Sequence, residues 1–165
     1  MSNPDYSSLV ADQRAYFLEG HTRSLAWRKT QLEAVKALFT DHHDELCNAL
    51  WKDLRRNVND ADLMDVNYCV KEAAYALKHI ESWMEPLHEP MPVVFEPGYI
   101  RVHRDPLGVA LIISAWNEPL MLLFGPLVAA LAAGNTAVLK PSEVAAHCAS
   151  AVARLVPQYF DPRIV

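Results

Sequence analysis

The sequence predicts an α/β protein in which amino-terminal helices precede an incomplete Rossmann-like βαβα unit. Before Pro86 the chain is charged, and its apolar residues recur at helical spacing. After Pro86 it is rich in Pro, Gly and β-branched residues. From Gly108 onward, short apolar runs alternate with longer helical segments, as in parallel sheets with crossover helices. We expect one incomplete domain, with a helical region at 1–85, an extended connector at 86–104 and a partial α/β unit at 105–165.

Two helices are expected to meet near Thr40. Asp41 has the residue type of an N-cap, and Asp44 and Glu45 would occupy the first turn of the second helix. The apolar residues of both helices fall near one face of a helical wheel. These residues are Leu32, Val35, Phe39, Leu46, Leu50 and Leu54.

A further helix is expected to begin after Asn59 or Asp60. Its apolar positions alternate spacings of three and four, but the seam is only three heptads long and contains an alanine. A helix facing a core is therefore favoured over a coiled coil. The apolar positions are Leu63, Val66, Val70, Ala73, Leu77, Ile80 and Met84.

Strands are expected after the connector. Four prolines in the segment from Glu85 to Pro97, the last included, indicate an extended segment, and residues 99–103 alternate as a short strand does. Residues 108–114 form a continuous apolar run, which is typical of a parallel strand covered on both faces. A crossover helix should follow from about residue 119 to residue 133, with Pro119 in its first turn.

A second strand is expected at residues 136–139, followed by a helix capped by Ser142 and ended by Pro157. Ile164-Val165 has the character of the start of another strand. Two or three strands make a thin sheet, so the pattern indicates an incomplete domain. The buried side of the last helix should carry Val144, Cys148, Val152 and Leu155.

A membrane-spanning helix is the less favoured interpretation of the uncharged segment 119–139. Gly125-Pro126 interrupts the segment, and Gly134-Asn135 is a helix C-cap signal followed by a short β-prone run. A buried helix followed by a buried strand fits this pattern better.

The composition is that of a globular protein, with 52% hydrophobic and 21% charged residues. The net charge of −5 and the lack of a basic patch disfavour nucleic acid as a partner. Three widely spaced cysteines without a CxxC pattern indicate a reducing compartment, which we take to be the cytoplasm. We expect all three to be buried structural thiols. No HxxxH, HExxH or CxxC occurs, so no metal site is expected.

Two motifs stand at the ends of the expected parallel strands, where open α/β sheets bind ligands. Lys140 could bond ribose hydroxyls or a phosphate, and Glu143 could accept hydrogen bonds from a ribose diol; a solvated helix cap explains the same residues. Asn117 carries a neutral amide donor suited to holding an oxyanion, with Trp116 as a wall. A turn asparagine and a packing tryptophan are equally consistent with the pattern.

The block from Asp105 to Glu143 resembles the aldehyde dehydrogenase superfamily. It contains Pro-Leu-Gly-Val, Trp-Asn-Glu-Pro at 116–119, and Ala-Ala-Gly-Asn-Thr-Ala-Val-Leu-Lys-Pro-Ser-Glu at 132–143. Thr-Arg-Ser-Leu at 22–25 and Gln-Leu-Glu-Ala at 31–34 are most similar to its class 3 and fatty aldehyde dehydrogenase branch. The resemblance covers the chain from about Tyr16 onward and corresponds to the amino-terminal portion of the family.

This resemblance implies roles for individual residues. Asn117 matches the oxyanion-hole asparagine, and Lys140 and Glu143 match contacts to the adenosine ribose of NAD or NADP. The strand end that lines the cofactor cleft would comprise Ile113, Ser114, Ala115 and Trp116. In such enzymes a cysteine thiolate attacks the aldehyde, hydride passes to the nicotinamide, and a glutamate-activated water releases the carboxylic acid.

The sequence departs from the family pattern in two ways. Glu118 follows Trp-Asn where the branch usually has an aromatic residue. The nucleophilic cysteine, the general-base glutamate and the glycine-containing loop would lie beyond Val165. We therefore expect an aldehyde dehydrogenase portion that is inactive alone and is completed by a complementary chain or a homodimer. The alternatives are a non-catalytic binding or assembly module and a small membrane protein.

Overall fold

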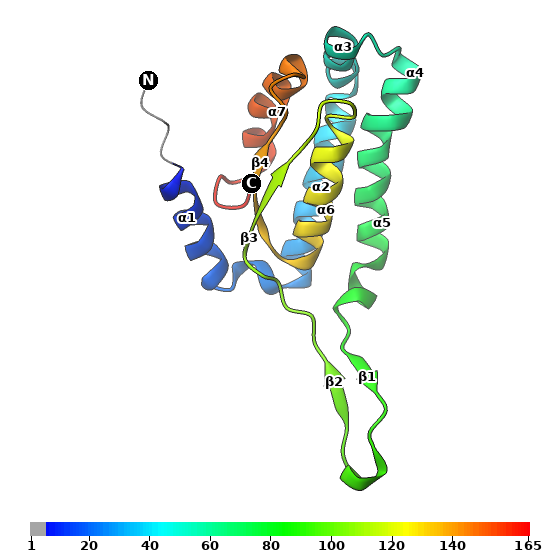
Figure 1. The fold of residues 1–165 in the computed structure, drawn as a ribbon, viewed down its shortest axis with the longest axis vertical. Coiled ribbons are helices and arrows are strands. Elements are labelled where there is room, and N and C mark those ends of the chain that lie inside the picture. Colours follow the sequence, from blue (N-terminus) through cyan, green and yellow to red (C-terminus); the bar gives the residue numbers. More distant parts are fainter. Residues whose placement is uncertain (1–5) are drawn as a thin grey trace.

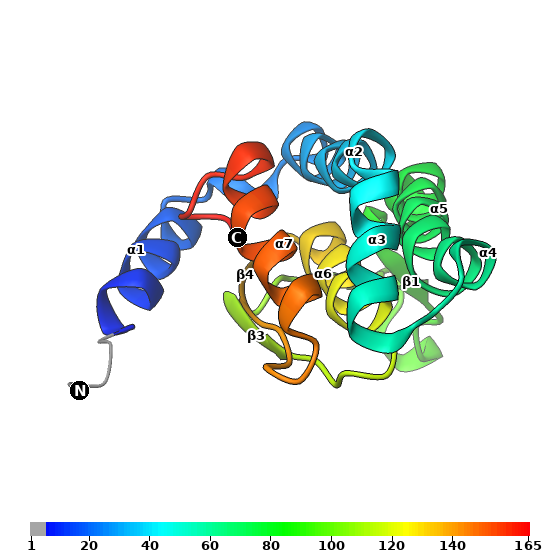
Figure 2. The same cartoon turned by 90° about the horizontal axis from the view of Figure 1, so that it is seen from above.

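The computed structural model describes residues 6–165 and confirms an α/β fold with a helical amino-terminal region (Figures 1 and 2). Within these residues, four strands form two small sheets, and three short turns of 3-10 or π-helix join the longer elements. The helices are α1 (Ser7–Leu18), α2 (Leu25–Asp41), α3 (His43–Leu54), α4 (Val58–Ala61), α5 (Asn67–Met84), α6 (Met121–Ala133) and α7 (Ala146–Tyr159). The short turns are η1 (His21–Arg23), η2 (Asp62–Val66) and η3 (Val93–Phe95), and the strands are β1 (Leu87–Glu89), β2 (Ile100–Val102), β3 (Val109–Ile113) and β4 (Thr136–Lys140).

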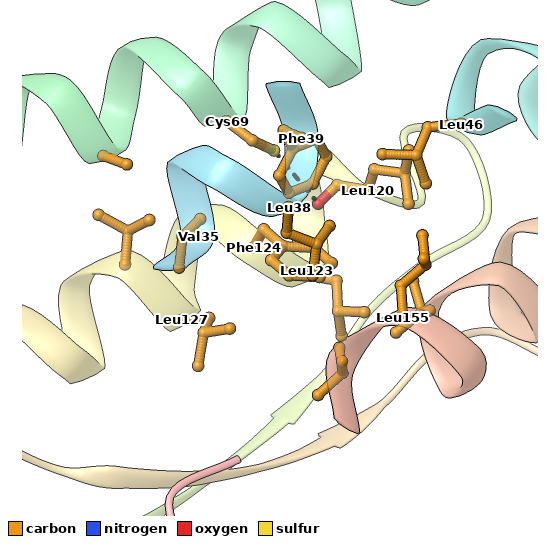
Figure 3. Packing of buried hydrophobic residues seen from close by; sticks show 14 of the residues in the cluster. Val35, Leu38, Phe39, Leu46, Cys69, Leu120, Leu123, Phe124, Leu127 and Leu155 are labelled. Carbon is orange, nitrogen blue, oxygen red and sulfur yellow. Dashed lines mark hydrogen bonds between the residues drawn. The ribbon is translucent and has the colours of Figure 1, made fainter. Parts of the chain in front are cut away.

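The core lies where α2, α5 and α6 pack together, with α3 and α7 closing one side (Figure 2). Phe39 of α2 meets Phe124 of α6 edge to face, with ring centroids 4.7 Å apart (Figure 3). Burial of such side chains stabilises each by about 1.5–3 kcal/mol. The largest fully buried side chains are Leu32, Leu38, Phe39, Leu46, Leu50, Ile80, Leu120, Leu123, Phe124, Leu127, Leu131 and Leu155.

The break between α2 and α3 confirms two helices meeting near Thr40, but Asp41 is not the N-cap. Asp41 is the last residue of α2, and His42 precedes α3. The Asp41 carboxylate instead accepts a hydrogen bond of 2.8 Å from the Tyr159 hydroxyl at the end of α7. The Asp41 carboxylate is therefore engaged in a tertiary hydrogen bond and does not cap the first turn of α3.

The next helical run begins at Val58, where the Asn57 side chain accepts from the Asp60 amide. The π-helical turn η2 adds a residue to one turn and so shifts the buried face. Leu63 is exposed as a result, which corrects its placement on the core face. Asp65 takes the interior position instead.

The segment expected to be extended contains a β-hairpin. β1 pairs antiparallel with β2, which confirms a strand near residues 99–103. The hairpin projects away from the helices, with η3 near its tip (Figure 1). The sequence predicted the second strand of the hairpin but not the first. Prolines lie on both sides of β1, and prolines are typical of segments that do not form strands.

β3 and β4 pair in parallel, as predicted, with Val109 opposite Thr136 and Ile113 opposite Lys140. The expectation that β3 is covered on both faces is wrong for the described residues. α6 contacts the strands, whereas Leu111 and Ile113 are 64% and 65% exposed. Ile164 lies in a turn, although its carbonyl accepts a 2.8 Å hydrogen bond from the amide of residue 137 in β4.

α6 begins at Met121, so Pro119 lies before the helix rather than in its first turn. Pro126 lies within the helix, which continues through it to Ala133. Gly134 ends the helix with a left-handed φ of 89°, as predicted. Among residues 6–165, no helix combines the length and apolar character that a membrane span needs.

α7 begins at Ala146, so Ser142 does not cap it. Asp53 of α3 takes this place, because its carboxylate accepts from the amides of His147 (3.0 Å) and Cys148 (2.8 Å). Val144 precedes the helix and is exposed, which corrects its expected burial, whereas Cys148, Val152 and Leu155 are buried as predicted. Pro157 lies inside the helix, which ends at residue 159.

Candidate functional site

The parallel pairing of β3 and β4 brings the two predicted motifs to one edge of the sheet. Ile113 stands opposite Lys140, and the amide of Ser114 donates a 3.2 Å hydrogen bond to the Lys140 carbonyl. The segments that leave these strands, 114–117 and 141–143, therefore start side by side. Carboxyl ends of parallel strands are where open α/β sheets bind ligands.

Lys140 and Glu143 form an ion pair at this edge. The Lys140 ammonium lies 2.5 Å from a Glu143 carboxylate oxygen, and both side chains are exposed. The hydrogen bond from Lys140 lowers the pKa of Glu143 below its ordinary value. Glu143 is thus a carboxylate at neutral pH, and the pair presents a donor and an acceptor to solvent. A vicinal diol has the matching hydrogen-bonding groups.

The four predicted cleft residues differ in exposure. Ile113 and Ala115 are exposed, and Trp116 is 53% exposed. Ser114 is buried, and its hydroxyl has no hydrogen-bond partner among the described residues 6–165. The strand end therefore offers apolar side chains to a ligand, whereas Ser114 contributes its backbone to the sheet.

Asn117 lies in the loop between β3 and α6, and its side chain is exposed. Its backbone carbonyl accepts a 2.6 Å hydrogen bond from Arg56. Within residues 6–165, no hydrogen bond joins Asn117 to Lys140 or Glu143. The two motifs thus share a sheet edge, but each contacts different residues: Asn117 contacts Arg56, and Lys140 contacts Glu143.

Sequence reasoning missed Arg56, which contacts Asn117, and the ion-pair partner of Arg56, Asp65. Arg56 pairs with Asp65, and Asp65 also accepts from the amides of Leu120 (3.0 Å) and Met121 (2.9 Å). Burial raises the pKa of Asp65, although these amides and Arg56 oppose that change. The only available signal was an aspartate beside the apolar seam, and the π-helical turn that buries it leaves no sequence pattern.

The three cysteines are free thiols in buried positions, as expected. Burial is the largest cause that raises the pKa of Cys47, Cys69 and Cys148 above its ordinary value. Cys69 also donates to the Leu120 carbonyl at 3.7 Å (Figure 3). Such thiols are poor nucleophiles, because the thiolate is the reactive form.

The aldehyde dehydrogenase family model matches residues 1–165. "Aldehyde dehydrogenase, dimeric NADP-preferring" of Canis lupus familiaris is 39% identical, over 94% of this chain and 34% of that relative. "Aldehyde dehydrogenase family 3 member F1" of Arabidopsis thaliana is 35% identical, over 94% of this chain and 32% of that relative. The chain thus spans about a third of the length of these relatives.

Among solved structures, "Substrate bound state of Staphylococcus Aureus AldH" has a TM-score of 0.95 and 29% identity, and the match covers 98% of this chain and 35% of that one. Glyceraldehyde-3-phosphate dehydrogenase GapN from Methanocaldococcus jannaschii, complexed with NADP, has a TM-score of 0.75 and 18% identity. That match covers 95% of this chain and 34% of GapN, and it shows the fold alone. The predicted resemblance to the class 3 branch is confirmed.

Proposed function

The chain belongs to the aldehyde dehydrogenase family, and we propose that it supplies the oxyanion donor and part of the cofactor cleft to an enzyme that oxidises aldehydes to carboxylic acids. The observation that carries the proposal is the register of β3 and β4. It sets Asn117 and the Lys140–Glu143 pair on loops from adjacent strand ends.

Asn117 is proposed to stabilise the oxyanion that forms when a nucleophile attacks the aldehyde carbonyl. Its amide is a neutral donor and carries no charge that would change as the reaction proceeds. Trp116 would exclude water from one side of the reacting carbon. The nucleophile is proposed to come from a segment outside these 165 residues, because the three thiols here are buried.

Lys140 and Glu143 are proposed to bind the adenosine ribose of NAD or NADP. When bound, this cofactor would accept hydride through its nicotinamide. Glu143 is ionised and exposed, so it can accept hydrogen bonds from both ribose hydroxyls. Ile113 and Trp116 would contact the cofactor through apolar surface. The Glu143 charge opposes a 2′-phosphate and Lys140 attracts one, so binding of NAD and NADP must be measured side by side.

Aldehyde-dependent formation of NADH or NADPH tests the proposal. The 165-residue chain alone should give no turnover, whereas the complete protein should be active. In that protein Asn117→Ala should lower kcat by about 10² to 10³, the usual effect of losing one oxyanion donor. Asn48→Ala, an exposed change on α3, is the matched control. Turnover by the chain alone, or an Asn117→Ala protein as active as the control, would contradict the assignment.

The projecting hairpin supports association with a complementary chain or a second copy. Val93, Val94 and Phe95 near its tip are exposed, although apolar side chains gain free energy from burial. Sedimentation of the chain should show a complex that Val94→Asp dissociates, with Val144→Asp as an exposed control outside the hairpin. Such association without any cofactor binding would favour the alternative, a non-catalytic assembly module.

Reduced, buried cysteines are proposed to reflect residence in the cytoplasm, where thiols persist. Fluorescent tagging of the protein at its natural expression level tests this location. Accumulation in an oxidising compartment would contradict it.

A further inference from the structure

We propose that Arg56 and Asp65 are positioning residues that fix the backbone of the Trp116–Asn117 loop, and so aim the Asn117 amide. The inference rests on the proposed function, because it matters for the reaction only if Asn117 is the oxyanion donor. Neither residue touches the reacting atoms.

Asp65 is the fixed point of this network. Its side chain is completely buried, although charged side chains are almost never buried without a partner. One carboxylate oxygen accepts from the amides of Leu120 and Met121 at the start of α6, where the helix dipole favours a negative charge. The π-helical turn η2 carries Asp65 into this position.

Arg56 connects this fixed point to the loop. Its Nη1 pairs with the other oxygen of Asp65, and its Nη2 donates to the Asn117 carbonyl at 2.6 Å. The guanidinium group is planar, so its two nitrogens hold both acceptors in one fixed arrangement. The Asn117 carbonyl is therefore held from one side by Arg56, and the chain is held three residues later by Asp65.

The local geometry explains why the side chain of Arg56, and not that of Arg55, contacts the loop that carries Asn117. α3 ends at Leu54, and the left-handed φ of 56° at the C-cap residue Arg55 turns the chain away from the helix axis before Arg56. The Arg56 side chain is 18% exposed, whereas Arg55 is exposed and lies over the ring of Trp51. Two consecutive arginines thus have different environments, and only the second reaches the site.

Stability and positioning can be separated with Arg56→Lys. Lysine keeps the positive charge beside Asp65, but its single ammonium cannot reproduce the two-nitrogen bridge to the carboxylate and the carbonyl. The fold should therefore remain, while the tie to Asn117 is lost. Arg55→Lys is the matched control, because it makes the same change at the neighbouring position.

The experiment measures 15N relaxation and amide chemical shifts in the 165-residue chain. In the unmodified chain, the Asn117 backbone amide should have an order parameter of about 0.85, the value of a rigid backbone. In Arg56→Lys the order parameter should fall below about 0.6, and the side-chain amide signals of Asn117 should move. Amides of β4 and α7 should not change, and Arg55→Lys should resemble the unmodified chain.

Two results would overturn the inference. One is an Asn117 amide already below about 0.6 in the unmodified chain, and the other is an Asn117 that Arg56→Lys leaves unchanged. If Arg56→Lys prevented folding, an Asn117 order parameter below about 0.6 in the unmodified chain would still overturn the inference. These readouts need no turnover, so failure of the inference is distinct from failure of the proposed function, which aldehyde oxidation tests.

Discussion

Replacing Asp53 with asparagine should destabilise the protein by weakening the start of α7, the helix that follows the Lys140–Glu143 pair. Asp53 belongs to α3, and its side chain is only 4% exposed. It accepts from the amides of His147 and Cys148 and from the imidazole of His147 at 2.7 Å. No residue adjacent to α7 provides this cap, because the side chain before it belongs to Ala145.

The magnitude follows from these contacts. Asparagine retains one acceptor oxygen, but its NH2 group would face an amide N–H that Asp53 now satisfies. Losing a hydrogen bond to a charged group costs about 1.5–3 kcal/mol, so we expect about 2–3 kcal/mol. For a domain of this size that corresponds to a fall in Tm of about 4–12 °C.

Thermal unfolding followed by circular dichroism across pH measures this effect. Burial raises the pKa of Asp53, but the hydrogen bonds from Cys148 and His147 outweigh it, so the folded-state pKa lies below the ordinary 3.8. The contribution of the carboxylate is therefore complete above pH 3.8 and is lost as pH falls through the folded-state pKa. The Tm difference between the two proteins should shrink over that range. An exposed change on α1, Asp12→Asn, should leave Tm within experimental error. A Tm difference below about 1 °C at neutral pH would refute the cap assignment.

Two further variants test other contacts by thermal unfolding. Gly134→Ala should cost about 2 kcal/mol or more, because its φ is +89° and the added carbon would lie 2.7 Å from a buried guanidinium nitrogen. Gly20→Ala shares the backbone strain without that clash, with its nearest atom at 3.9 Å, so equal losses for both would contradict the clash. Hydrogen bonds with Asp44 and Asp62 raise the pKa of His43 above 6.5, so its contribution is complete below pH 6.5 and is lost as pH rises through the folded-state value. His43→Gln should remove that part of the pH dependence of Tm, and an unchanged profile would count against the ion pairs.

The sequence was most informative where local patterns and tertiary structure agree. The apolar run of β3, the left-handed glycine after α6 and the strand at 136–140 were all predictable, because each is set by the residues within it. Asn117 and Lys140 could be placed at strand ends for the same reason. Their proximity followed from a single rule, that parallel strands end at the same edge.

The errors share a different cause, which is that distant residues replaced local ones. Ser142 has the residue type of a cap, but Asp53 binds the first amides of α7 from another helix. Asp41 also has the type of a cap and instead accepts from Tyr159. In each case the partner lies 94 or more residues away in the chain, so no window of local sequence contains the interaction.

Asp53 and Asp65 together show what the helical region does for the site. Each places a carboxylate at the amino terminus of a helix that follows a site loop, Asp65 at α6 after Asn117 and Asp53 at α7 after Glu143. Helix amino termini attract negative charge, so both contacts hold the α/β unit against α3 and the turn η2. Asp65 and Asp53 of the helical region therefore hold the backbone that follows each loop at the sheet edge. The side chains of Asn117, Lys140 and Glu143 remain exposed. That arrangement leaves the proposed ligand-binding groups accessible while fixing the backbone that carries them.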